Sequence, residues 1–191
     1  MRGSLGEGAA APSCWSRALT IMTIDFEASC LPRHGRSFPI EVGIATPVMS
    51  RSWLIRPTDE WLGWDWTAEA EALHNLTRDR VLREGLPAAQ VLAELAQTVG
   101  NCRLVSDSSL DRYWLDRLAE AAGKPAPFAI DHAGSLFDEA GTSSATVAAA
   151  IARASAQVSA RHRASADALW LAHVLDHALA PEPAPMMEAA Q

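Results

Sequence analysis

The hydrophobic pattern of the chain begins with an apolar, β-branched run that ends in two acidic residues. Residues 19–24 are nearly all apolar and rich in Ile and Thr, which predicts a strand buried on both faces. Asp25 and Glu27 follow at the C-terminal end of this strand. Because alternate residues of a strand point to the same side, we expect both carboxylates to project into one space.

Four further apolar runs predict strands, and their spacing indicates how some of them pair. The runs cover residues 39–46, 52–55, 103–106 and 128–130. A short connection at 47–51 predicts a hairpin, which makes the first three strands antiparallel neighbours. Glu41 should point to the face opposite Ile40 and Val42, and the pattern leaves open whether that face is exposed.

Helical periodicity appears in the second half of the chain. Helices are predicted at residues 88–99, 110–122 and 143–160, and a last helix follows residues 162–167 and ends near 179. Polar residues 107–109 offer N-cap chemistry for the helix that begins at Leu110. Three neighbouring strands followed by alternating helices and strands predict an α/β fold, a mixed five-stranded sheet flanked by helices.

Length and composition agree with one domain and restrict its partners. The chain has 191 residues, of which 49% are hydrophobic and 20% are charged. The net charge is -7 and the pI is near 5.3, so no broad basic field is expected to hold a long nucleic acid non-specifically. A nucleic-acid partner would have to be held locally, by metal ions or a few basic side chains.

The cysteines indicate the redox compartment of the protein, and the composition of the chain ends indicates whether they fold. Cys14, Cys30 and Cys102 are scattered and form no C-x-x-C pair, which argues against a zinc site or a disulfide framework. This usage suits a reducing cytoplasm, where we expect the protein to reside. No apolar run approaches the length of a membrane span. Residues 1–18 and 181–191, rich in small residues and Pro, are expected to be disordered extensions.

Four acidic residues and one histidine form the candidate chemistry. Asp111 lies in the first turn of its predicted helix, and His162 and Asp167 precede the last helix. Asp25 and Glu27 should repel each other at the end of a buried strand, and a divalent cation would relieve both the repulsion and the cost of burial. Oxygen ligands suit Mg²⁺ or Mn²⁺. Taken alone, Asp111 fits a partner of the helix dipole, and His162 fits a surface histidine at a helix start.

Together these residues resemble the motifs of the DnaQ-like exonucleases of the DEDDh type, which have an RNase H-like fold. The similar segments are Asp-x-Glu at 25–27, Val-Ser-Asp-Ser-Ser-Leu-Asp at 105–111, His-x4-Asp at 162–167, Ser-Phe-Pro-Ile-Glu-Val-Gly at 37–43 and Leu-His-Asn-Leu at 73–76. Ala28, Cys30, Asp107 and Leu110 depart from the residues that many members have. These departures concern the seating of the substrate and remove no metal ligand.

The resemblance implies a 3′–5′ exonuclease domain at residues 19–180 that depends on Mg²⁺ or Mn²⁺, two ions per site. The implied metal ligands are Asp25, Glu27, Asp111 and Asp167. His162 would take the proton of the attacking water, since histidine is suited to proton transfer near neutral pH. Phe26 and His74 are expected to contact the substrate, a single-stranded DNA or RNA 3′ end that is degraded to nucleoside 5′-monophosphates. The resemblance leaves a homodimer open.

Other interpretations stay open from the sequence. The same fold could act as a non-catalytic module that binds nucleic acid or protein, and the carboxylates could hold a structural metal. Trp61, Trp64 and Trp66 are interpreted as core packing in preference to a platform for stacked bases. The basic residues at 33–36 fit a solvated loop as well as a phosphate contact. The sequence does not choose between DNA and RNA.

Overall fold

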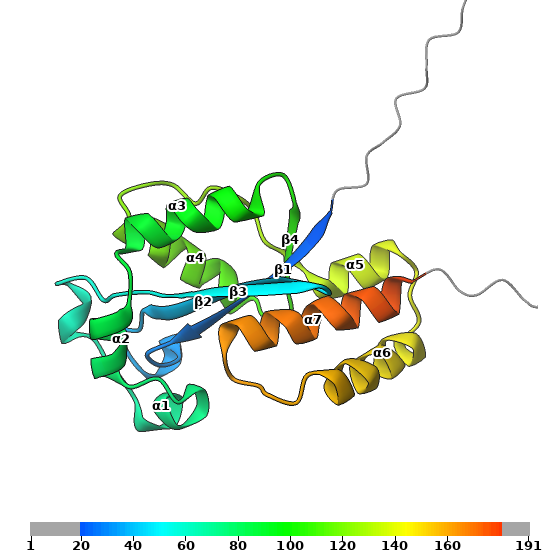
Figure 1. Cartoon of the computed structure of the whole chain (residues 1–191), viewed down its shortest axis with the longest axis horizontal. Helices are drawn as coiled ribbons and strands as arrows, with labels where there is room; N and C mark the ends of the chain where they lie inside the picture. The colour runs from blue at the N-terminus through cyan, green and yellow to red at the C-terminus, as the bar shows by residue number, and fades with distance from the viewer. Residues whose placement is uncertain (1–19, 181–191) are drawn as a thin grey trace, which may run out of the picture.

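A mixed five-stranded sheet lies at the centre of the protein (Figure 1). The computed structural model describes residues 20–180, so the predicted extensions at 1–18 and 181–191 lie outside the described residues. In spatial order the strands are β3 (Met49–Leu54), β2 (Pro39–Thr46), β1 (Ile21–Ala28), β4 (Arg103–Ser106) and β5 (Asp131–His132). β1, β2 and β3 are antiparallel neighbours, whereas β4 runs parallel to β1 and β5 runs parallel to β4. The predicted fold class is confirmed.

The limits of three strands differ from the prediction. β1 continues through Asp25 and Glu27, because β2 remains paired with it along this stretch; the carboxylates are therefore part of the strand and do not follow it. β3 begins at Met49, which pairs with Thr46 across a tight turn, so the predicted loop at 47–51 is too long. The last strand lies just after the predicted run at 128–130, where it pairs with β4.

Seven α-helices surround the sheet within the described residues. They are α1 (Ala68–His74), α2 (Arg78–Glu84), α3 (Ala88–Val99), α4 (Leu110–Ala121), α5 (Ala133–Glu139), α6 (Ser144–Gln157) and α7 (Ala164–Leu179), with 3₁₀ turns at Pro32–His34 and Trp61–Gly63. The predicted helices correspond to α3, α4, α6 and α7. α1, α2 and α5 were not predicted, because they have 7 residues each and are too short to show a helical period.

The two faces of the sheet are covered differently (Figure 1). Met22, Ile24 and Phe26 of β1 belong to the large core on the side of α3 and α4. The alternate residues of β1 face α7, and the Thr23 hydroxyl donates a hydrogen bond of 2.6 Å to the carbonyl of Ala168 there. The period of two along the strand therefore separates an apolar core face from a face that carries the acidic residues.

Small residues let α7 lie very close to the sheet. A Cβ atom on Gly43 of β2 would come within 2.2 Å of the carbonyl carbon of Ala164, the first residue of α7. One and two turns further along, Ala168 and Ala172 pack against Ala45 of the same strand. Because Gly43 pairs directly with Asp25, this contact holds the first turn of α7 beside the acidic end of β1.

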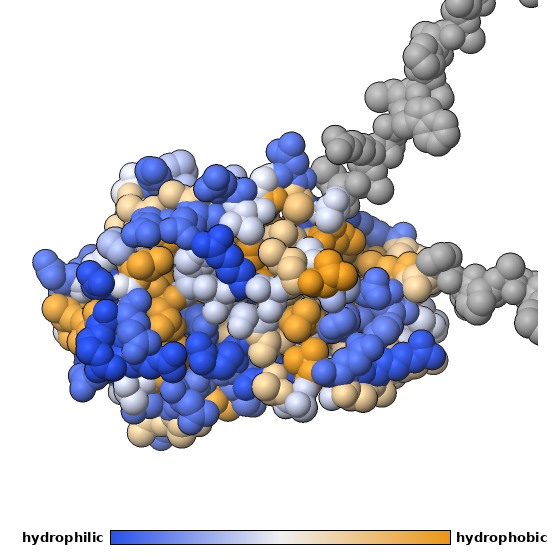
Figure 2. Space-filling view, in the orientation of Figure 1, coloured by the Kyte–Doolittle hydropathy of each residue, from blue (hydrophilic) through white to orange (hydrophobic). Residues whose placement is uncertain are grey.

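The tryptophans predicted as core packing lie near the start of β2, where Phe38 follows the C-terminal end of β1. Trp61 is buried and stacks on Phe38 with 5.4 Å between ring centroids, which confirms its core role, whereas Trp64 and Trp66 are half-buried. On the outer surface, hydrophilic residues gather over α2, which carries three arginines (Figure 2). No helix among residues 20–180 is both long and apolar enough to cross a membrane.

Candidate metal centre

Three of the predicted carboxylates meet in space. Oxygen atoms of Asp25, Glu27 and Asp167 all lie within 4.8 Å of one another, although Asp167 comes from α7 and the other two from β1. Glu27 and Asp25 share one side of β1, as the strand period predicts, and Asp167 follows the close contact of α7 with Gly43. Hard oxygen ligands at this spacing suit a divalent cation.

Asp111 completes the group of four acids. It lies in the first turn of α4, is 2% exposed, and lines the same cavity as Asp25 and Glu27. Its carboxylate accepts a hydrogen bond from the Ser106 hydroxyl, which fixes its direction. The polar residues expected to cap this helix do so through Ser108, whose hydroxyl accepts a hydrogen bond of 3.2 Å from the Leu110 N–H, whereas the Ser109 side chain makes no capping hydrogen bond.

Burial and mutual repulsion dominate the electrostatics of this group. Burial, followed by the charges of Asp111 and Glu27, raises the pKa of Asp25 well above its ordinary value. Burial and then the Asp167 charge raise the pKa of Glu27 to about 8, and burial raises the pKa of Asp111 to about 7. The protein thus keeps buried acids that lack sufficient positive charge, and a divalent cation would offset both causes.

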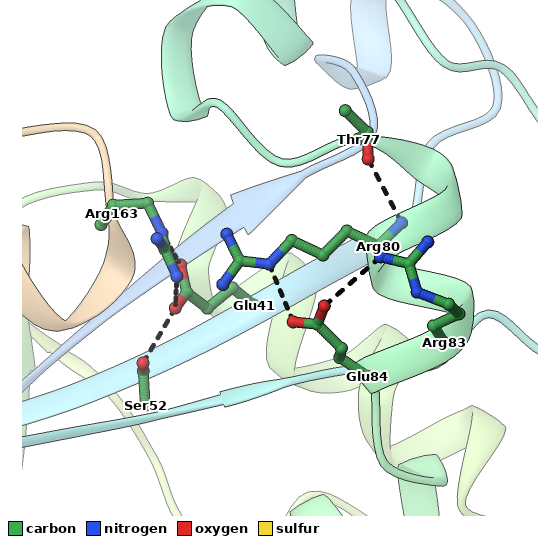
Figure 3. Close-up of polar contacts among 7 residues, drawn as sticks. All are labelled: Glu41, Ser52, Thr77, Arg80, Arg83, Glu84 and Arg163. Atoms are coloured by element: carbon green, nitrogen blue, oxygen red, sulfur yellow. Dashed lines mark hydrogen bonds and ion pairs between the residues drawn. The ribbon is translucent and has the colours of Figure 1, made fainter.

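An ion pair with one buried partner, which the sequence did not predict, lies beside the acidic group. The Arg163 guanidinium donates to both oxygens of Glu41, at 2.9 and 2.8 Å, and the Ser52 hydroxyl donates to the same carboxylate at 2.8 Å (Figure 3). Glu41 is fully buried and stands directly opposite Glu27 in the sheet, so the face that the pattern left open is covered. The signal was present as an acidic residue within an apolar strand, but its partner lies 122 residues away.

His162 meets the carboxylates through its backbone. Its N–H donates a hydrogen bond of 2.8 Å to Asp167, and its φ of 65° places it in the left-handed region. The residue is exposed, in the loop that leads into α7. The second oxygen of Asp167 pairs with Arg161, whose guanidinium lies 4.1 Å from the ring centroid of Trp170. Arg161 is a residue of this site that the sequence did not predict.

A cavity of about 280 Å³ opens beside the acids. Its lining includes the predicted substrate contacts Phe26 and His74 and the apolar side chains of Leu31, Leu73 and Trp114. His74 Nδ1 accepts a hydrogen bond of 3.0 Å from the Leu76 N–H, and burial lowers the pKa of His74. His74 is therefore neutral and carries its proton on Nε2, a buried atom that has no hydrogen-bond partner within the described residues.

The basic loop after β1 contributes little to this cavity. His34 lines it, whereas the Arg36 guanidinium donates to the carbonyl of Gly63 at 3.2 Å and lies 5.7 Å from the ring centroid of Trp64. Arg33 donates to the neighbouring His34 ring at 3.1 Å. The solvated-loop interpretation therefore describes Arg36 better than a phosphate contact does.

No protein-family model and no curated protein matches the sequence, but solved structures match the fold. E. coli exonuclease I in complex with a dT13 oligonucleotide aligns with a TM-score of 0.59 and 12% identity, over 84% of this chain and 41% of that one. Exonuclease I from Methylocaldum szegediense aligns with a TM-score of 0.52 and 13% identity, over 83% and 40%. This chain thus spans about two fifths of the length of exonuclease I.

A full-length 3′-exonuclease aligns more evenly, with a TM-score of 0.57 and 16% identity over 81% of this chain and 78% of that one. Sequence identities this low show that the fold is shared, and they do not establish a shared activity or substrate. The chain therefore has the RNase H-like fold of these exonucleases, as expected from its motifs.

Proposed function

We propose that the protein is a metal-dependent 3′–5′ exonuclease that releases nucleoside 5′-monophosphates from single-stranded DNA or RNA. The observation that carries the proposal is the meeting of acids from β1 and α7, with Asp111 of α4 lining one cavity together with Asp25 and Glu27. The fold shared with solved exonucleases supports it. In this proposal Asp25, Glu27, Asp111 and Asp167 hold two Mg²⁺ or Mn²⁺ ions, which when bound activate a water and stabilise charge on the phosphate.

The chain's own residues would position the substrate. Phe26 lines the cavity, and a terminal base could contact it there. His74 lines the same cavity and could contact the terminal nucleotide there. The apolar lining excludes water from the reacting end, and an unpaired nucleotide enters such a cavity more easily than a duplex end does.

His162 is proposed as the general base. Its imidazole would accept the proton of the attacking water, and the loop before α7 would bring the ring over the acids. The hydrogen bond from its backbone to Asp167 ties this loop to the acidic group. A non-catalytic binding module is the alternative, and the exposure of His162 is the observation that favours it.

The test uses the full chain with single-stranded DNA and RNA oligomers of several lengths, labelled at the 5′ end. With Mn²⁺ we expect successive shortening from the 3′ end and release of mononucleotides, and no reaction in chelator. Asp111→Asn is the matched control, because it keeps the shape of the side chain but loses a ligand charge. Folded protein that binds the oligomers with metal and does not shorten them would establish the binding module; equal activity of Asp111→Asn would reject the assigned site.

A further inference from the structure

Arg161 connects the acidic group to an aromatic side chain on the surface of α7. Its guanidinium pairs with Asp167 and lies 4.1 Å from the ring centroid of Trp170. Asp167 and Trp170 are three positions apart on the helix, so they are neighbours on one face and Arg161 spans both. The Trp170 indole is itself held by a hydrogen bond of 3.0 Å to the Ser155 hydroxyl of α6.

The two contacts of Arg161 respond differently to a cation in the site. Both oxygens of Asp167 are engaged, one by Arg161 and one by the His162 N–H. A divalent ion held by Asp25, Glu27 and Asp167 would lie close to the guanidinium that pairs with Asp167, and the two positive charges would repel each other. The contact with Trp170 involves no carboxylate, so nothing about metal binding removes it.

The exposure of the pair makes this exchange feasible. The Arg161 side chain is 35% exposed, so it can turn away from Asp167 without leaving a buried charge unpaired. Its planar guanidinium can bind a phosphate through two parallel hydrogen bonds while its face stays on the indole. In a chain with net charge -7, such local cations are the means of holding a polyanion.

We propose that Arg161 neutralises Asp167 in the metal-free protein, leaves it when a divalent ion binds, and then binds a phosphate of the nucleic acid from its place on Trp170. The metal competition follows from contacts within the chain, whereas the phosphate contact rests on the proposed function. Arg161 would thus act as a counter-ion in one state and as a substrate-binding residue in the other.

The first experiment measures Mn²⁺ binding to the full chain by calorimetry, without nucleic acid, for the parent, Arg161→Gln and Arg153→Gln. Arg153 is exposed on α6 and gives the same change in net charge. We expect Arg161→Gln to bind Mn²⁺ about 2- to 10-fold more tightly, because a partly exposed ion pair no longer competes, and Arg153→Gln to match the parent. Unchanged affinity in Arg161→Gln would overturn the counter-ion role.

The second experiment measures the affinity of a single-stranded oligonucleotide by fluorescence anisotropy, with Ca²⁺ in place of Mn²⁺, over a range of salt. Arg161→Gln should weaken binding and lower the slope of log affinity against log salt by about 0.7, the loss of one phosphate contact. Arg153→Gln should keep the parent slope. An unchanged slope in Arg161→Gln would overturn the phosphate contact.

These results separate the inference from the proposed function. If the parent binds Mn²⁺ and the oligonucleotide but hydrolyses nothing, exonuclease activity is rejected. The changes in Mn²⁺ affinity and in salt slope caused by Arg161→Gln would still test the two roles of Arg161. A parent chain that is folded but does not bind Mn²⁺ would overturn the inference together with the metal centre. The melting temperature in chelator checks that each variant is folded.

Discussion

Replacing Gly43 with alanine tests whether the close approach of α7 to the sheet assembles the acidic group. The new Cβ would lie 2.2 Å from the carbonyl carbon and 2.3 Å from the amide nitrogen at the start of α7, where ordinary contacts begin at 3.4 Å. Both neighbours are backbone atoms in a helix, so no side chain can turn aside. The first turn of α7 must retreat by about 1 Å, since packed interiors hold no spare volume.

This retreat should affect stability and the site by different amounts. Overpacking of this kind costs about 1–3 kcal/mol, and the gain from replacing glycine in a strand offsets roughly 0.5–1 kcal/mol of it. Asp167 lies in the same first turn as the displaced atoms and would move away from Asp25. A displacement of about 1 Å can reduce a reaction rate by about 100-fold. We therefore expect a modest loss of stability and a large loss of Mn²⁺ affinity and activity.

Urea unfolding in chelator, Mn²⁺ calorimetry and oligonucleotide hydrolysis measure the three effects. Gly63→Ala is the matched control, because a Cβ at Gly63 meets nothing within 4 Å and should change none of them. If Gly43→Ala kept the parent's stability, Mn²⁺ affinity and activity, the close contact would not be what holds Asp167 beside Asp25.

Three further predictions follow from the acidic group and its surroundings. His162→Ala should slow hydrolysis by about 10²–10⁴-fold without weakening Mn²⁺ binding; unchanged rates from pH 5 to 9 would exclude it as the base. Glu41→Gln should lower the free energy of unfolding by about 1–3 kcal/mol in a urea titration, because this buried side chain loses its charge-assisted hydrogen bonds from Arg163, whereas Glu84→Gln at an exposed pair should change little; equal effects would contradict the role of burial (Figure 3). In chelator, the free energy of unfolding should fall as the pH rises from about 4.5 toward about 8, because folded Glu27 and Asp111, with pKa values raised to about 8 and about 7, hold protons that the unfolded chain releases; urea midpoints that rise over this range would refute it.

Most of the secondary structure could be predicted because its signals are local. β2, α3 and β4 have the predicted bounds, and the buried residues of α3 are those of its apolar stripe. The short helices α1 and α2 escaped prediction, although Thr67 and Thr77 cap them through side-chain hydrogen bonds. Such caps are visible in a sequence, but a two-turn helix lacks the repeated period that would separate it from a loop.

The residues of the candidate site also fall into two groups, those that the local sequence predicted and those that depend on tertiary contacts. Order and residue type along the chain predicted its acids, and the strand period put Asp25 and Glu27 on one side of β1. The catalytic role of His162 stays a prediction. Arg161 and the Glu41 pair could not be identified in advance, because each depends on which atoms of α7 and its preceding loop reach the sheet.

The sequence by itself determined the five strands approximately, the four longer helices, their apolar faces and the candidate metal ligands, since all of these depend on the chemistry and spacing of near neighbours. Only the tertiary structure decided that Asp167 lies beside Asp25, that Glu41 is buried against Arg163, and that Arg161 faces the acids. The physical reason is that a helix settles on a sheet at the distance its smallest contacting residues allow. Here Gly43 sets that distance, although it precedes α7 by more than a hundred residues in the sequence.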